Sequence, residues 1–252
     1  MEQHAPSGSR RTPSPIVELR QYTLLPGKRD VLIDIFEREF IEWQEAVGIE
    51  VIDHFRDLDD PDRFVWLRGF PDLPTRATAN EAFYAGEVFR RNRDTANAVL
   101  VDYTNVLLLR PAGPAWVYPT DGERPPAGVT GGPTCLVVAT IYQLDPAAEA
   151  EFPAFFETSV APELTACGAT TLAAYATEHS PNNYPRLAIR EGEHVFVWFS
   201  RFADVAAYER HLTGLARSPR WRGEIEPALA QRIKGTPEVR RLVPTARSRT
   251  RA

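Results

Sequence analysis

Cysteine is scarce in this chain: Cys135 and Cys167 are the only two among 252 residues, and neither stands in a Cys-x-x-Cys or Cys/His spacing. A cysteine-based zinc site and a disulfide framework are therefore not expected. The sequence also lacks a Gly-rich phosphate loop, a nucleophile elbow and a metal-binding His pair. These absences predict a cytoplasmic protein that works without a metal or an organic cofactor.

Excess positive charge and long apolar runs are missing as well. The net charge of −5 argues against nucleic acid as a main partner. Residues 1–15 combine Pro, Ser and Arg without an apolar run, so they are expected to be a disordered leader rather than a signal or a membrane span. The expected partner is a small molecule, with no nucleic acid and no membrane.

The residues that are present form an internal repeat. Subtracting 120 from the numbering aligns Tyr142 with Tyr22, and subtracting 132 aligns Trp198 with Trp66. The two registers differ by one insertion, which falls around residues 182–193, between the second and third expected strands of the second copy. A longer loop costs little at such a place.

Each copy is expected to fold as strand, helix, strand, strand, helix, strand. Residues 16–24 and 134–143 are rich in β-formers, residues 31–47 carry apolar side chains with helical period, and the Ala-rich residues 75–102 supply a second helix. This order is the split βαβ pattern. Two such sheets can bury their bare faces against each other, which predicts an α+β fold of two tandem ferredoxin-like βαββαβ modules paired within one chain.

Changes in composition set the expected domain boundaries. The segments are a disordered leader at 1–15, a first module at 16–112, a Pro/Gly-rich linker at 113–133, a second, divergent module at 134–245 and a disordered, solvent-facing basic tail at 246–252. Trp116 and Tyr118 are expected to hold the linker down. The fold is also compatible with association of two chains into a homodimer.

Strand alternation divides the side chains of the first module between two faces, because residues two apart share a face. We assign Val17, Leu19, Val65 and Leu67 to the helix layer. The face toward the other copy then receives a polar and aromatic set: Glu18, Arg20, Tyr22, His54, Arg56, Phe64, Trp66 and Arg68. The second copy has uncharged residues at the matching positions, among them Val138 and Thr140, so its wall is expected to offer space lined by Tyr142, Phe196 and Trp198.

These residue types suit proton transfer to or from a small molecule. His54 or Glu18 is the candidate to move a proton, and Tyr22 is the candidate hydrogen-bond donor. The candidates for substrate binding are Arg20, Arg56, Trp66, Arg68, Tyr142 and Trp198.

Purely structural roles remain alternatives for the same residues. Glu18 and Arg20 could form a structural ion pair, and His54 could be tied to a neighbouring carbonyl. In a collapsed pocket, Glu18, Arg20 and Arg68 would form a closed salt-bridge cluster.

Three stretches together resemble the NIPSNAP family: Val17-Glu18-Leu19-Arg20-Gln21-Tyr22 with Pro26-Gly27, then Asp62-Arg63-Phe64-Val65-Trp66-Leu67-Arg68-Gly69-Phe70, and Asn105-Val106-Leu107-Leu108-Leu109-Arg110-Pro111. The match covers residues 15–112 well and the second copy only in skeleton. The resemblance implies the dimeric α+β barrel fold, here formed within one chain. It also implies kinship with cofactor-free antibiotic-biosynthesis monooxygenases, polyketide cyclases and lactone isomerases.

The leading functional hypothesis is a cofactor-free enzyme of bacterial secondary metabolism that acts by acid/base chemistry on a carbonyl or phenolic metabolite, as a cyclase, isomerase or monooxygenase. The alternative is a non-catalytic small-molecule-binding or scaffold protein of the NIPSNAP family. Haem stays open too, because other barrels of this superfamily hold it through a histidine, and His179, His194 and His211 are available.

Overall fold

The computed structural model describes residues 14–251. The elements of the first half are β1 (Ile16–Leu24), α1 (Arg29–Ile35), the π-helical turn η1 (Phe36–Phe40), α2 (Ile41–Ala46), β2 (Glu50–Asp57), β3 (Arg63–Phe70), α3 (Leu73–Ala85), α4 (Glu87–Asn97), β4 (Leu100–Asp102) and β5 (Val106–Pro111). Those of the second half are β6 (Leu136–Leu144), α5 (Phe152–Phe155), η2 (Phe156–Val160), α6 (Ala161–Ala166), β7 (Thr170–Thr177), β8 (Val195–Phe202), α7 (Val205–Arg217), η3 (Trp221–Ile225), α8 (Glu226–Ala230) and β9 (Ile233–Pro244). Both halves thus follow the predicted strand and helix order.

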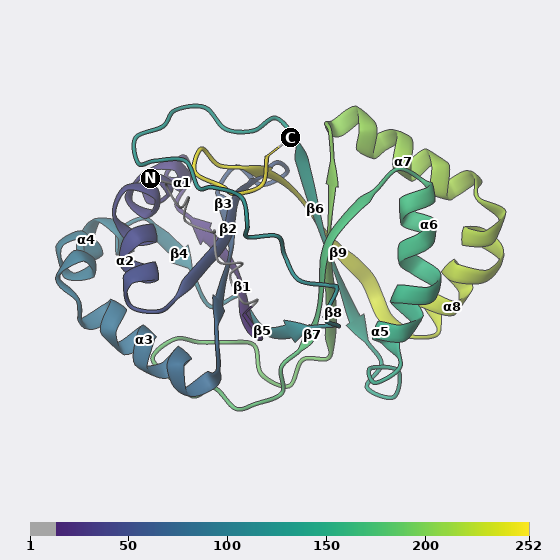
Figure 1. Cartoon of the computed structure of the whole chain (residues 1–252), viewed down its shortest axis with the longest axis horizontal. Helices are drawn as coiled ribbons and strands as arrows, with labels where there is room; N and C mark the ends of the chain where they lie inside the picture. Colours follow the sequence, from purple (N-terminus) through teal and green to yellow (C-terminus); the bar gives the residue numbers. More distant parts are fainter. Residues whose placement is uncertain (1–13, 252) are drawn as a thin grey trace, which may run out of the picture.

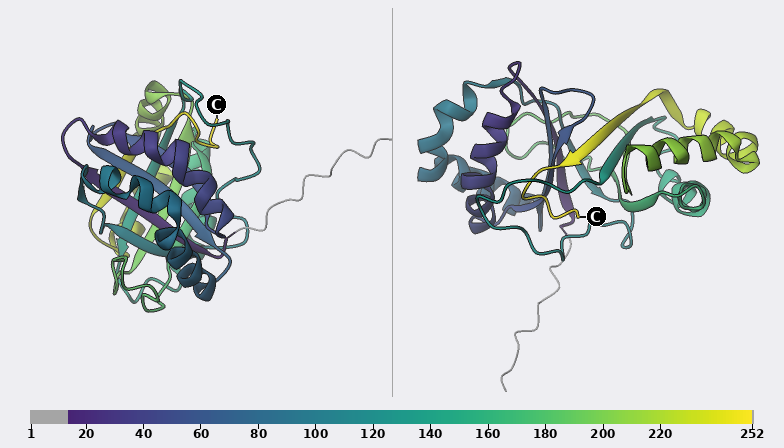
Figure 2. Two further views of the ribbon diagram at one scale, coloured as in Figure 1. Left: turned by 90° about the vertical axis from the view of Figure 1, so that its left-hand side faces the viewer. Right: turned by 90° about the horizontal axis from the view of Figure 1, so that it is seen from above.

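The strands form one closed antiparallel barrel. Their order is β3-β2-β9-β6-β8-β7-β5-β1, the pairing of β1 with β3 closes the ring, and short β4 is added to β1. The halves are joined where β2 pairs with β9 and where β5 pairs with β7. Helices α1–α4 cover one side of the barrel and α5–α8 the other (Figure 1), and the view from above separates the two helix layers clearly (Figure 2). The predicted fold, two ferredoxin-like modules forming an α+β barrel in one chain, is confirmed.

Equivalent local signals begin and end the helices of both modules. The side chain of Asp72 accepts a 2.6 Å hydrogen bond from the Thr75 backbone N–H at the start of α3, and Asp204 does the same for α7. Gly48 and Gly168 follow α2 and α6 with φ of 93° and 94°, a left-handed conformation that glycine adopts without a Cβ clash. These matched signals explain why the order of elements is repeated.

The strand faces are the reverse of our assignment. Val17, Leu19, Val65 and Leu67 pack inside the barrel with apolar residues of the second module, whereas Tyr22, Phe64 and Trp66 pack under the helices of the first. The alternation itself is present as predicted. Both faces of β1 and β3 are buried, so the polarity of the side chains could not show which face lies inside the barrel. The face with the polar side chains is the one that the helices cover.

The linker at residues 113–133 lies against the barrel, where two aromatic side chains hold it as expected. The Trp116 ring contacts Phe156 with centroids 5.5 Å apart, and the buried Tyr118 packs on Phe199 with centroids 5.7 Å apart. The Tyr118 hydroxyl also forms a 2.8 Å hydrogen bond with Thr250, so the linker and the C-terminal segment hold each other.

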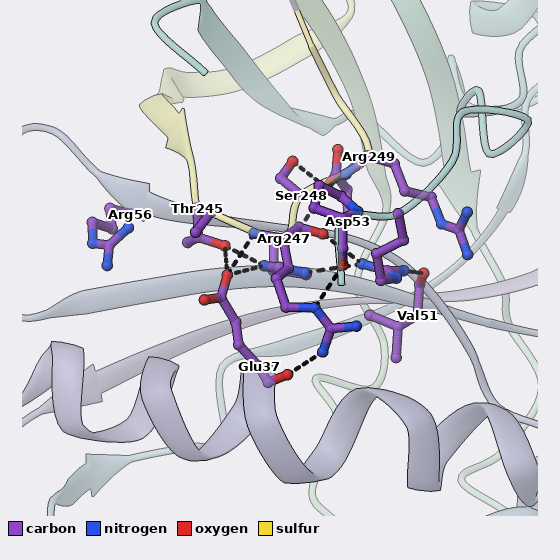
Figure 3. Close-up of polar contacts among 12 residues, drawn as sticks. Glu37, Val51, Asp53, Arg56, Thr245, Arg247, Ser248 and Arg249 are labelled. Carbon is purple, nitrogen blue, oxygen red and sulfur yellow. Dashed lines mark hydrogen bonds and ion pairs between the residues drawn. The ribbon is translucent and has the colours of Figure 1, made fainter. Parts of the chain in front are cut away.

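The C-terminal segment is not the solvent-facing tail that we expected. Ser248 is fully buried, and its hydroxyl donates to Asp53, which also accepts from the backbone N–H groups of Arg249 and Thr250 at 3.0 and 3.1 Å. Figure 3 shows this segment above the strand that carries Asp53. The prediction for residues 246–251 was wrong because the acidic partners of these basic residues lie some 200 positions earlier in the chain.

None of the described helices has both the length and the apolar character needed to cross a membrane. Residues 1–13 of the expected leader and residue 252 lie outside the described residues.

Candidate functional site

A cavity of about 400 Å³ lies between the sheet and the helices of the first module. Tyr22 of β1 and Trp66 of β3 form part of its floor, and Phe83 and Tyr84 of α3 contribute to its wall. Aromatic side chains dominate the lining, which suits a flat apolar molecule.

Four ionisable side chains are buried together beside this cavity. Glu18 of β1 accepts from Arg68 Nε at 2.7 Å and from Arg76 Nε at 2.6 Å, and it also pairs with Arg20. All four side chains have 0% exposure. With three positive charges against one negative, the cluster carries a net charge of +2, and we refer to these four residues as the arginine cluster.

Glu18 is a poor proton acceptor in this setting. Burial alone would raise the pKa of its carboxyl group, but the charges of Arg68, Arg20 and Arg76 outweigh burial and hold the pKa well below the ordinary value. Both carboxylate oxygens already accept hydrogen bonds from guanidinium groups. Glu18 therefore neutralises and positions the arginines.

The arginine cluster has unused hydrogen-bonding capacity. Nη2 of Arg20, both Nη atoms of Arg68 and Nη2 of Arg76 are buried and make no hydrogen bond to any described residue. Buried guanidinium groups without enough partners are costly unless an anion supplies the missing acceptors. Positive charge and unpaired donors thus both favour a negatively charged ligand group nearby.

Tyr22 connects the arginine cluster to the cavity. Arg20 Nε donates a 2.9 Å hydrogen bond to the Tyr22 hydroxyl oxygen, and the same tyrosine lines the cavity. Because this oxygen accepts from a cation, its O–H is left as a strengthened donor. Trp66 lies between two guanidinium groups, with its ring 5.5 Å from Arg20 and 5.4 Å from Arg68.

A loop of the second module covers the cavity. Residues 178–194 connect β7 to β8, and three of them, Tyr184, Arg186 and Leu187, line the cavity of the first module. Figure 1 shows this loop extending from the barrel to α3. It contains the insertion found by the repeat comparison, so the extra residues of the second copy contribute to the site of the first. We call residues 178–194 the covering loop.

Polar contacts hold the covering loop on α3. Arg76 Nη1 donates to the side-chain oxygens of Asn183 at 2.6 Å and Asn182 at 3.1 Å. The Tyr184 hydroxyl donates to Glu81 at 3.0 Å, and the Tyr184 ring stacks on Tyr84 with centroids 6.3 Å apart. Burial raises the pKa of Tyr84 to about 12, so this residue is a neutral phenol at the cavity wall.

Tyr142 and Trp198 lie under the helices of the second module, on the opposite side of the barrel from the cavity. They line a separate cavity of about 160 Å³, whose floor also includes Thr140 and Ser200. The strand registers place Thr140 where Arg20 lies in the first module and Ser200 where Arg68 lies. The predicted single pocket with two unlike walls is therefore wrong: the modules have separate cavities, and the arginine cluster adjoins only the first.

His54 does not line the cavity either. Its ring packs on Phe36 with centroids 5.3 Å apart, Nε2 accepts a 3.0 Å hydrogen bond from Arg124, and Nδ1 contacts the Thr245 hydroxyl. Thr245 donates in turn to Glu37, which fixes the proton of the neutral ring on Nδ1. Both ring nitrogens thus serve to hold the linker and the C-terminal segment.

The electrostatic setting also disfavours His54 as a proton acceptor in catalysis. Burial first, and then the positive charges of Arg124, Arg247 and Arg249, hold its pKa well below the usual value. In Figure 3, Arg56 points away from Arg247 and Arg249, and it pairs with Asp30 at 2.9 Å near the surface. The strand register confirms that His54 and Arg56 share a sheet face with Glu18 and Arg20, because Trp66 of β3 pairs with both Arg20 and His54, and Phe64 pairs with Arg56. They are nevertheless not part of the same site, because both lie on β2, beyond β3, where His54 binds Arg124 and Thr245 and Arg56 binds Asp30.

Our reading of the sequence missed Arg76, which completes the arginine cluster from α3. Arg76, Ala79, Asn80 and Phe83 are all buried and follow the spacing of one helical face. An arginine on the apolar stripe of a helix is the signal that could have identified it.

Solved structures share this architecture. A putative monooxygenase from Lactobacillus acidophilus is 13% identical with a TM-score of 0.54, over 93% of this chain and 98% of its own. An anthrone oxidase-like protein is 15% identical with a TM-score of 0.56, over 93% of both chains. A NIPSNAP family protein from Agrobacterium tumefaciens aligns with 48% of this chain and 94% of its own, at 20% identity and a TM-score of 0.37.

The likenesses to the Lactobacillus acidophilus protein and to the anthrone oxidase-like protein show the α+β barrel fold. No family model matches the chain, and no curated protein matches its sequence. NIPSNAP proteins are thus among the structural neighbours, and their likeness extends over about half of this chain.

Proposed function

We propose that the first-module cavity binds a flat phenolic or enolisable carbonyl compound as its anion, and that the protein is a cofactor-independent enzyme acting on that anion. One observation carries the proposal: Tyr22 lines the cavity and accepts a hydrogen bond from Arg20 of a buried cluster with a net charge of +2. Donors placed in this way stabilise an oxyanion more strongly than water does, because they need no reorientation when the charge forms.

The protein's role in this proposal is to stabilise the anion rather than to accept the proton. None of the described residues that line the cavity carries a carboxylate or an imidazole. Tyr22 donates to the oxyanion, Arg20 and Arg68 supply positive charge behind it, and Glu18 positions the arginines. Stabilising the anion lowers the pKa of the bound compound, so that water or a buffer base removes the proton.

Anthrone is the first compound to test, since it is flat, forms an enolate and is named in the description of one structural neighbour. One anthrone and one O₂ give one anthraquinone and one water. One oxygen atom enters the new carbonyl group and the other leaves as water. Product absorbance and oxygen consumption follow the same reaction independently.

The decisive comparison is between Tyr22→Phe and Tyr142→Phe. Both tyrosines occupy the same strand position, but only Tyr22 has an arginine at the position two residues before it. We expect Tyr22→Phe to lower the turnover rate on the order of 10²-fold, the usual effect of removing one oxyanion donor, and Tyr142→Phe to leave it unchanged. The rate should also rise with buffer-base concentration.

The non-catalytic alternative gives a different result in the same experiment. A binding protein would show Tyr22-dependent fluorescence quenching by anthrone without acceleration above the buffer rate. Equal rates for the two variants, together with equal anthrone binding, would contradict the proposed site.

A further inference from the structure

Away from the cavity, Glu149, His179 and His194 converge on one point. His179 Nε2 lies 2.7 Å from one oxygen of Glu149, and His194 Nδ1 lies 2.5 Å from the other. Each residue offers one ligand atom, and these atoms all lie within 4.8 Å of one another. Two imidazole nitrogens and one carboxylate oxygen are thus close enough together to bind the same small ion.

This group lies at the base of the covering loop. His179 comes two residues after the end of β7, and His194 immediately precedes β8, so the two histidines mark the two ends of the loop. Glu149 belongs to the turn between β6 and α5 and approaches from outside the hairpin. The imidazole rings have centroids 5.1 Å apart, which agrees with two ligands on one centre rather than two independent ion pairs.

The donor atoms suit a divalent first-row transition metal. Zn²⁺ binds imidazole nitrogen and carboxylate oxygen at about 2.0–2.2 Å, so tetrahedral ligands on one ion lie about 3.4 Å apart. In the structure, the imidazole nitrogens lie 2.7 and 2.5 Å from the Glu149 oxygens. Both imidazoles are partly exposed, so a small outward movement of each ring brings these distances to the spacing of zinc ligands. Ca²⁺ and Mg²⁺ prefer oxygen ligands and do not match this set.

Charge and access favour a cation at the same point. The Glu149 carboxylate brings negative charge to the point where the two imidazole nitrogens meet. The His179 side chain is 48% exposed, which provides a path for the ion. The two rings face one carboxylate, an arrangement for a small ion rather than for an axial ligand of haem.

We propose that Glu149, His179 and His194 form a site for a divalent transition metal, with Zn²⁺ as its best match, that joins the two ends of the covering loop to the β6–α5 turn. Three protein ligands leave a fourth position for water. Binding would fix the two ends of the covering loop to each other, and so would reduce the mobility of this loop over the first-module cavity.

The test is a titration of Zn²⁺ into full-length, metal-free protein without a purification tag, followed by calorimetry. We expect one ion per chain, with affinity at least about tenfold weaker in Glu149→Gln and in His179→Ala. Glu151→Gln is the matched control, because Glu151 lies in the same turn but pairs with Arg232 at 3.1 Å. The visible absorption of Co²⁺ bound in place of Zn²⁺ would report the number of ligands.

A second measurement follows the covering loop itself. Trypsin can cleave after Arg186, whose side chain is 68% exposed, and Zn²⁺ should slow this cleavage in the wild type but not in His179→Ala. Equal Zn²⁺ affinity in the wild type, Glu149→Gln and His179→Ala would overturn the site. Tight binding with no effect on cleavage would overturn its link to the covering loop. Neither readout depends on the activity proposed above.

Discussion

Arg76 of the first module donates a 2.6 Å hydrogen bond to the side chain of Asn183 in the second module. The same guanidinium group contacts Glu18 through its Nε atom. One side chain therefore links the buried arginine cluster to the loop that covers the cavity. Any movement of this loop away from α3 would therefore break a hydrogen bond made by a member of the arginine cluster.

Removing this link should loosen the covering loop. In Asn183→Ala the contacts with Arg76 and with the Leu73 carbonyl are lost, so we expect faster tryptic cleavage after Arg186. Ser180→Ala is the control, because its hydroxyl bonds to Glu178 within the loop. Cleavage at the same rate in both variants would show that the contact with α3 does not restrain the loop.

Glu18→Gln should destabilise the fold strongly. The substitution leaves three buried guanidinium groups without a counter-charge, and removal of one partner from a buried ion pair costs about 3–5 kcal/mol. Urea unfolding measures the change. For comparison, Glu39→Gln removes a partly exposed pair with Arg91 and should cost less than about 1 kcal/mol. A small loss in Glu18→Gln would mean that the arginine cluster rearranges to reach water.

The stability of the protein should depend on His54 below neutral pH. Its pKa is lowered on folding, by burial first and then by Arg124, so the unfolded chain binds a proton that the folded chain does not. The contribution is complete above the ordinary histidine pKa of about 6.5 and declines as pH falls below it, by up to about 1.4 kcal/mol per pH unit.

The measurement is the free energy of unfolding in urea between pH 7 and pH 5. We expect a steeper decline in the wild type than in His54→Gln, whose amide can still accept a hydrogen bond from Arg124 but does not titrate. Parallel curves for the two proteins would show that His54 is not kept neutral.

Deleting residues 246–252 should destabilise the first module. Asp53 is fully buried and would lose its contacts with Ser248, Arg249 and Thr250, so we expect a loss of about 3 kcal/mol in chemical unfolding. Arg251→Ala is the control, since this exposed side chain does not contact Asp53 and donates a hydrogen bond to the Ala246 carbonyl. A truncated chain as stable as the wild type would show that water replaces these contacts without cost.

The architecture could be predicted because each module repeats the same local signals. Tyr22 and Tyr142 are related by the offset of 120 residues, and Trp66 and Trp198 by the offset of 132 residues. Helix caps such as Asp72 and Asp204 also recur at matching positions. Periodicity, caps and turns are local properties, so the sequence shows them directly. The closed barrel then follows from the need of two sheets to bury their bare faces.

The site could be predicted only in part, because its arrangement depends on contacts between distant segments. Glu18, Arg20, Tyr22, Trp66 and Arg68 do gather on one face, as alternation requires. Which face lies under the helices is not encoded in a strand that is buried on both sides. The paths of the covering loop and of the C-terminal segment depend on partners more than 100 positions away, which no local pattern reveals.

Because the two modules are fused in one chain, the two cavities of the barrel can differ from each other. A barrel made from two identical chains would have two equivalent cavities, and every substitution would appear in both. Here Arg20 adjoins one cavity and Thr140 the other, while the loop of the second module covers the first. If the proposed function is correct, one barrel binds one anion with a simple hyperbolic saturation curve, and the second module contributes the loop that covers the site of the first.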